Sequence, residues 1–234
     1  LDCLRVLRSR LWRYVVLLQN HSILLRTHPE LAKIFTALNG TNDVEISQCS
    51  SARCPKNLTT NLKLLGICPS GLTKDQGNQC TNGTLRWAKG STEKFGVDEV
   101  LMPSLMATEE LRIPGSFTHR CLPKKSQVIT KYAVWYDKKQ CGSRNMRHAN
   151  CVFGVEDLPS LFNQPRVFAN KMMPSFDYSA IACVAEVLHN RTTGQRNDFL
   201  NISYYENIQS VRYNRLKGSA NFDPMRLKCD SIGL

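Results

Sequence analysis

The chain has 234 residues, of which 42% are hydrophobic, so it contains enough apolar material for one domain or two small ones. This composition excludes a chain that stays disordered for lack of hydrophobic residues. The formal net charge of +12 favours anionic partners such as phosphorylated ligands. Nucleic acid is the less favoured partner, because the sequence has no RNP motif, zinc-finger spacing or basic region followed by heptads.

The cysteines and glycosylation sequons favour the secretory pathway. The ten cysteines are scattered without a CxxC pair, which favours disulfides over zinc. Composition alone would give roughly two to three Asn-x-Ser/Thr sequons, whereas six are present, at Asn20, Asn39, Asn57, Asn82, Asn190 and Asn201. The apolar residues 14–18 are too few to cross a membrane, and no signal peptide is visible. Because the chain also begins at Leu1, we expect a fragment of a longer protein.

The first 40 residues predict an α/β unit. The aromatic and β-branched run Leu11–Leu18 predicts a buried strand, with a core helix segment as the alternative. Thr27 followed by Pro29 and Glu30 predicts a capped helix start. This helix should end at residues 39–40, an Asn-Gly pair. Its apolar face consists of Leu31, Ile34, Phe35 and Leu38.

The middle of the chain is less regular. Residues 45–89 show no periodicity and contain four cysteines, so we expect a disulfide-tied loop region. Asp98 and Glu99 open an apolar helical run, where carboxylates suit the helix dipole. Residues 126–136 predict a strand, with Val128, Thr130, Tyr132 and Val134 on one side. Trp135 should point the other way, although an isolated tryptophan is more often a core residue.

A basic loop between Cys141 and Cys151 is the strongest functional signal. It contains Arg144, Arg147 and His148, and an acidic helix start follows at residues 156–157. Lys171 lies further along the chain. An arginine and a lysine on either side of a short helix could bind a diphosphate without a metal, because both stay charged at neutral pH. The alternative is that both are ordinary solvated surface cations.

The last third predicts one further helix. Residues 177–190 should be amphipathic, with Ile181, Val184, Ala185, Val187 and Leu188 facing inward. Residues 204–213 (YYENIQSVRY) favour a short polar strand or loop, followed by a basic tail to which we assign no chemistry.

Two separated motifs carry a resemblance to a known family. CVFGVEDL (151–158) followed by FANKMMPSFDYSAIACVAEVLHNRT (168–192) is similar to the C-terminal half of the core-2/I-branching β-1,6-N-acetylglucosaminyltransferases. In that family a basic loop before a VCxxGxxDL run, and a later ANK triplet, hold the UDP diphosphate in place of a metal. The resemblance implies that Arg147 and Lys171 do so here, with the loop closed by a Cys141–Cys151 disulfide. Arg147 lies one residue further from the second cysteine than in the family, and His148 takes the matching offset.

The resemblance also assigns roles to three other residues. Residues 12–40 are similar to the family's strand, loop and K-T-N-x-E helix, so Glu30 would contact the acceptor sugar. GVDEVLM resembles the P-D-E-x-x-W box, which makes Glu99 the candidate general base. Trp135 resembles the family's acceptor-stacking tryptophan. The family's Ser-Gly-Ser strand and long helix find no counterpart near residues 90–92.

The implied fold is α/β: an incomplete, disulfide-tied GT-A-like glycosyltransferase domain with a mixed sheet and flanking helices. Residues 1–234 would form its C-terminal part, without the N-terminal nucleotide-binding part, stem and membrane anchor. The implied activity moves N-acetylglucosamine from UDP-GlcNAc to a 6-hydroxyl of an acceptor glycan with inversion, needing neither metal nor other cofactor. The implied location is the lumenal side of the Golgi membrane, as a type II membrane protein. The alternative is a truncated, inactive, cysteine-rich module of the secretory pathway.

Overall fold

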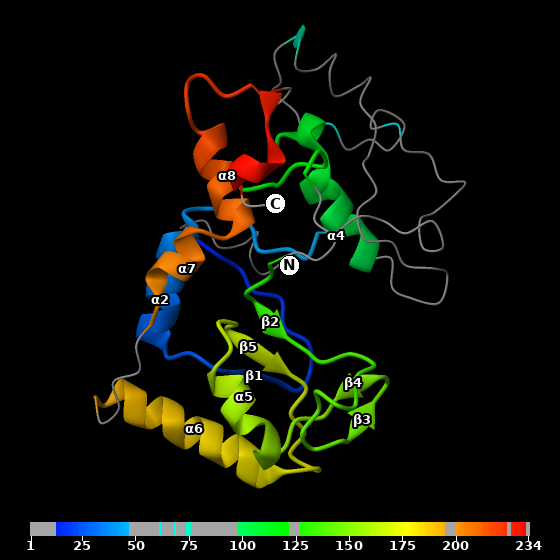
Figure 1. Cartoon of the computed structure of the whole chain (residues 1–234), viewed down its shortest axis with the longest axis vertical. Coiled ribbons are helices and arrows are strands. Elements are labelled where there is room, and N and C mark those ends of the chain that lie inside the picture. The colour runs from blue at the N-terminus through cyan, green and yellow to red at the C-terminus, as the bar shows by residue number, and fades with distance from the viewer. Residues whose placement is uncertain are drawn as a thin grey trace, which may run out of the picture. The chain divides into compact units, whose positions relative to one another are not determined.

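The computed structural model describes residues 13–46, 61, 68, 74–75, 98–121, 127–194, 200–223 and 226–232. The chain forms two compact units (Figure 1). Unit 1 consists of Leu1–Gly40 and Ile129–Ile202, and unit 2 of Thr41–Val128 and Ser203–Leu234. The expectations for residues 1–12, for most of 45–89 and for the missing elements near 90–92 fall outside the described residues.

A small mixed sheet lies at the centre of unit 1, which confirms the predicted mixed α/β class. Its strands are β1 (Ser22–Leu24), β5 (Phe168–Asn170) and β2 (Lys131–Tyr132). The order is β1-β5-β2, with β5 antiparallel to β1 and parallel to β2 (Figure 1). The middle strand β5 is buried along its whole length, as a strand covered on both faces should be.

The strand predicted at Leu11–Leu18 is wrong wherever the structure describes it. Residues 13–19 form no strand, and Leu17 is 71% exposed. The strand lies further along, where Ser22–Leu24 pairs in register with β5. An apolar run without alternation does not indicate which residues pair with a neighbouring strand. A prediction based on hydrophobicity alone therefore put the strand too early in the chain. Tyr14 in this segment stacks its ring on Phe35 with the centroids 5.0 Å apart.

Helix α2 (His28–Leu38) confirms the predicted cap and end. The Thr27 hydroxyl accepts from the Glu30 amide, and the Glu30 carboxylate accepts from the Thr27 amide, so two orphan donors are satisfied together. Asn39 ends the helix in the left-handed region with φ 47°. Ile34 and Leu38 are buried, as the predicted apolar face requires.

Helices α5 (Leu158–Phe162) and α6 (Tyr178–Thr192) share one core with the sheet. This core contains Leu25, Val134, Phe153, Leu158, Leu161, Ala169, Met172, Ala180 and Val184. The helix predicted at 177–190 is therefore confirmed, with Asp177 as its N-cap. Ala185 was wrongly placed inward, because Ala180 and Val184, four residues apart, set the buried line and leave Ala185 exposed.

The strand predicted at residues 126–136 is shorter than expected. Only Lys131–Tyr132 form β2, and the chain then makes an isolated bridge from Trp135 to Asn150. Val134 is buried and Trp135 is 48% exposed, as predicted. Ile129 is buried although alternation placed it on the other side, so the segment does not keep one face inward along its length.

Unit 2 is built from short helices: α4 (Asp98–Ala107), η1 (Glu109–Leu111), α8 (Gln209–Lys217) and η4 (Cys229–Ile232), with α7 (Ile202–Glu206) starting at its boundary. Its core includes Met106, Phe117, Tyr213 and Ile232. The strand or loop predicted at residues 204–213 is wrong, since this stretch is mostly helical. Tyr205, Ile208 and Val211 are all buried, and their spacing of three fits a helix rather than a strand.

A disulfide joins Cys121 to Cys229, with the sulfur atoms 2.10 Å apart. It ties the tail, which had been assigned no role, to the core of unit 2. Closing a loop of this length, 108 residues, contributes about 4–5 kcal/mol in the entropic description. Within the part of the chain that the structure describes, no helix has the length and hydropathy needed to cross a membrane.

Tyr213 should make unit 2 sensitive to alkaline pH. Burial, with a smaller contribution from the Glu109 carboxylate, raises the pKa of Tyr213 well above its ordinary value. The unfolded chain loses this proton near pH 10 while the folded chain keeps it. Stability should therefore be complete below pH 10, and above it should fall by about 1.4 kcal/mol per pH unit until the folded group also ionises.

Urea midpoints of the wild type and Tyr213→Phe, measured from pH 8 to 11, test this. The variant should lack the part of the alkaline fall that Tyr213 causes. Other groups cancel in the comparison, including Lys217, whose pKa burial lowers and whose effect on stability has the opposite sign. Tyr178→Phe, at a tyrosine 69% exposed, is the matched control and should follow the wild type. Equal slopes in the wild type and Tyr213→Phe would contradict the prediction.

Candidate functional site

A β-hairpin with a two-residue turn carries Arg147 at the surface of unit 1. Strands β3 (Met146–Arg147) and β4 (Asn150–Cys151) pair so that Arg147 faces Asn150. The turn residues His148 and Ala149 have φ of 50° and 60°, and positive φ at both central positions is the signature of the type I′ turn. Arg147 is the last strand residue before this turn, and its side chain is exposed.

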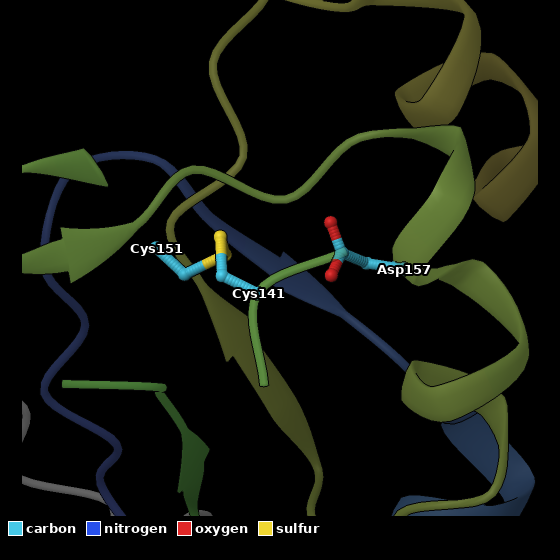
Figure 2. Close-up of side chains that lie close together, drawn as sticks. All are labelled: Cys141, Cys151 and Asp157. Atoms are coloured by element: carbon cyan, nitrogen blue, oxygen red, sulfur yellow. A yellow bond between two sulfur atoms is a disulfide. The ribbon is translucent and has the colours of Figure 1, made fainter. Parts of the chain in front are cut away.

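A disulfide between Cys141 and Cys151 closes the base of this loop. The sulfur atoms are 1.99 Å apart, and both residues are buried (Figure 2). The pair is the one that the resemblance implied. Within the loop the Ser143 hydroxyl donates to the Val152 carbonyl over 2.6 Å.

The buried carboxylate of Asp157 joins the start of this loop to the segment that follows it. One oxygen accepts from the Gly142 amide at 2.6 Å, and the other from the amides of Ser143 at 3.1 Å and Gly154 at 3.0 Å. Figure 2 shows the carboxylate directed toward the chain beside Cys141. A Cβ atom at Gly142 would lie 2.9 Å from the Asp157 oxygen, so only glycine allows this approach. The sequence predicted an acidic helix start here but not this anchoring role.

Asp177 connects the segment to α6 in the same manner. One of its oxygens accepts from the Val155 amide at 2.9 Å, and the other from the Ala180 amide at 3.0 Å. A single carboxylate therefore joins the short helical turn η2 (Val155–Asp157) to the first turn of α6.

Lys171 lies beside Arg147. The chain leaving β5 runs along the end of the hairpin, because the Phe153 amide donates to the Lys171 carbonyl at 2.9 Å. The Lys171 ammonium donates to the Arg147 carbonyl at 3.4 Å. The Arg147 guanidinium in turn lies 3.3 Å from the sulfur of Met173, two residues beyond Lys171. The two residues predicted to bind phosphate therefore come from separate segments and are in contact through the Arg147 backbone carbonyl.

Two buried amides connect the segments that carry these cations. Asn150 donates to the side-chain oxygen of Asn170 at 3.3 Å, and Asn170 donates to the Asn20 carbonyl and the Ser22 hydroxyl. Asn150 is opposite Arg147 in the hairpin, and Asn170 precedes Lys171. Sequence reasoning missed both amides. The ANK motif could have indicated Asn170, but no pattern distinguished Asn150 from the rest of the loop.

The other predicted site residues are more dispersed. Trp135 lies next to the hairpin through its bridge to Asn150, so it is close to the cations. Glu30 uses one oxygen for the cap of α2, and among the described residues no contact joins it to Arg147, Lys171 or Trp135. Glu99 belongs to α4 in unit 2, and its side chain falls outside the description.

In the described ranges, one group of side chains has the spacing of metal ligands: Cys141, Cys151 and Asp157, whose ligand atoms lie within 4.8 Å of one another. Thiolates, rather than disulfide sulfurs, are the ligands that bind zinc. Here the two sulfurs are bonded to each other, and the carboxylate already accepts three backbone amides. The cluster therefore functions as a structural anchor.

The comparisons with known proteins add no assignment. We found no family model and no curated protein that matches this chain. The likeness to the branching glycosyltransferases consequently supports a proposal and nothing firmer.

Asp157→Asn should destabilise unit 1 without changing its shape. The amide keeps one acceptor oxygen, but its NH2 group must then face a backbone donor, so at least one buried N–H loses its partner. We expect the free energy of unfolding to fall by about 3 kcal/mol, measured by urea denaturation. Glu156→Gln changes the same charge at the exposed neighbour and should cost less than about 0.5 kcal/mol. Equal losses in the two variants would show that Asp157 is not the anchor.

Proposed function

We propose that unit 1 binds the diphosphate of a UDP-sugar between Arg147 and Lys171, as part of a GT-A-like glycosyltransferase. The observation that supports this is the 3.4 Å contact between the Lys171 ammonium and the Arg147 backbone carbonyl, which makes these two residues neighbours although they come from separate segments. Neither side chain is buried, so both can reach a ligand from solvent. Both donate hydrogen bonds to phosphate oxygens and stay charged at neutral pH.

The reaction is transfer of N-acetylglucosamine to a 6-hydroxyl of an acceptor glycan, with inversion. Glu99 removes the hydroxyl proton as the oxygen attacks the anomeric carbon. The bond from that carbon to the UDP oxygen breaks, and negative charge develops on the diphosphate. Arg147 and Lys171 stabilise this charge, and preorganised groups of this kind contribute on the order of 10²–10³ in rate each. The sequence contains no Asp-x-Asp pair, so these cations take the role that a metal has in related folds.

Trp135 and Glu30 complete the proposal on the acceptor side. The exposed indole of Trp135 is next to the hairpin and can stack on the C–H face of a sugar. Glu30 can combine capping with sugar binding, because only one of its oxygens is used by the cap. The lumen of the Golgi is the compartment that suits both this reaction and disulfides such as Cys121–Cys229 and Cys141–Cys151.

Removing either cation should weaken UDP binding. Arg147→Gln and Lys171→Gln each delete a charged donor at the same ligand, so each should raise the Kd for UDP about tenfold or more in calorimetric titrations at physiological salt. Arg144→Gln is the matched control, since Arg144 is exposed in the same loop and carries the same charge. Its Kd should stay within about twofold of the wild type.

The titrations also distinguish the proposed UDP-binding domain from the alternative, an inactive cysteine-rich module. A chain that binds no UDP would be the inactive cysteine-rich module, and an affinity that falls equally in all three variants would contradict a specific site at Arg147 and Lys171. Coupling between Arg147 and Lys171 in the double variant would add direct support, because two groups that share one ligand do not act independently.

Glu99→Gln should abolish sugar transfer while leaving UDP affinity unchanged. The amide keeps the size of the side chain but cannot accept the acceptor proton. Transfer is measured with UDP-GlcNAc and a panel of acceptor glycans, alongside UDP titrations of the same samples. Full activity in this variant would remove Glu99 from the mechanism, whereas lost UDP affinity would give it a role in folding or donor binding instead.

A further inference from the structure

The amide side chain of Asn170 joins three separate segments of unit 1. It lies at the end of β5 and is 1% exposed. Its Nδ2 atom donates to the Asn20 carbonyl at 3.0 Å and to the Ser22 hydroxyl at 3.2 Å, where β1 begins. Its Oδ1 atom accepts from Nδ2 of Asn150 in β4 at 3.3 Å. One side chain therefore connects β5 both with β1 and with the hairpin.

The chemistry of the partners fixes the orientation of both amides. A carbonyl oxygen only accepts hydrogen bonds, so the NH2 group of Asn170 must face Asn20. The Asn170 oxygen then faces Asn150, which must present its own NH2 group. Turning either amide over would bring two oxygens or two NH2 groups together. The pair therefore has a single arrangement.

Stability alone does not account for Asn150. Its NH2 group makes one long hydrogen bond of 3.3 Å, and its Oδ1 atom is buried without a partner among the described residues. A buried acceptor without a donor is unfavourable, whereas an apolar side chain of similar shape, such as leucine, avoids this cost. A buried polar contact of this kind can still select one arrangement of the segments that it joins.

The contact between the two amides joins the immediate neighbours of the two cations. Asn150 pairs with Arg147 across the hairpin, and Asn170 precedes Lys171 along the chain. The Lys171 ammonium donates to the Arg147 backbone carbonyl at 3.4 Å. A change in the amide contact should therefore move Lys171 relative to the hairpin that carries Arg147.

We propose that Asn150 and Asn170 are positioning residues that hold the side chains of Arg147 and Lys171 at the spacing of one diphosphate. This inference rests on the proposed function, because it assigns the amides a part in the same UDP site. Each amide is 1% exposed, so it acts through the cations and not by touching the ligand. Two groups bind one ligand well only when the residues behind them fix their geometry.

The test is UDP binding by the full chain with Asn150→Leu, measured by calorimetry. Leucine preserves the shape and the charge of the segment and deletes the donor to Asn170. The Kd for UDP should rise about fivefold. In this background the effects of Arg147→Gln and Lys171→Gln on Kd should become independent, so that the double variant shows their product. A merely structural role would lower the urea midpoint and leave the coupling between the cations unchanged.

Thr27→Ala is the control for a general loss of stability. It removes the cap of α2 and should lower the urea midpoint. In the described part of unit 1, no hydrogen bond joins Thr27 to Asn150 or Asn170, so its Kd for UDP should stay within about twofold of the wild type. A loss of affinity equal to that of Asn150→Leu would show that destabilisation causes both effects, which would overturn the positioning role.

The outcomes separate this inference from the function on which it rests. If Asn150→Leu does not fold, Asn150→Ser takes its place, because its shorter polar side chain also loses the bond to Asn170. A wild type that binds UDP, with affinity and coupling unchanged in the Asn150 variant, overturns the positioning role and leaves the proposed function standing. A wild type that binds no UDP overturns the proposed function and the positioning role together.

Discussion

The Asp157 carboxylate is the constraint on which the candidate site depends. It accepts the amides of Gly142, Ser143 and Gly154, and so joins the start of the cysteine loop to the turn that leads into α5. The disulfide between Cys141 and Cys151 closes the same loop covalently. Hydrogen bonds from backbone donors to a buried carboxylate are stronger than those between neutral groups. Hydrogen bonds and a disulfide therefore both hold the base of the hairpin that carries Arg147.

The second cation is placed by the sheet. Lys171 directly follows β5, the middle strand, which is held by β1 on one side and β2 on the other. The Asn150–Asn170 contact then links the strand segment to the hairpin. Arg147 and Lys171 thus become neighbours by independent routes, the first through a loop anchor and the second through a strand.

Local signals in the sequence predicted local structure well. The sequence predicted the capping box at Thr27 and Glu30, and it predicted the amphipathic helix α6. Both predictions were possible because a cap and a helical face are determined within a few residues. The strand at Leu11–Leu18 was misplaced because β1 is fixed by its pairing with β5, far along the chain. The helices near residues 204–213 were missed because polar residues separate the buried Tyr205, Ile208 and Val211.

The candidate site shows the same difference between features determined by local sequence and features determined by distant contacts. Arg147 and Lys171 were visible as residue types within motifs, and their proximity came from the fold. The roles of Asp157 and Asn150 depend on groups that lie near them only in three dimensions, so no spacing in the sequence could indicate them.

The pairing of β1 with β5 has a consequence for biosynthesis. Ser22 and Asn170 are 148 residues apart, with the first part of unit 2 encoded between them. Ribosomes add about 5–20 residues per second, so β1 must wait roughly 7 to 30 seconds for its only described antiparallel partner. Throughout that interval its edge is open to strands of neighbouring nascent chains. A chaperone that shields the β1 segment as it emerges would therefore improve the yield of correctly folded molecules.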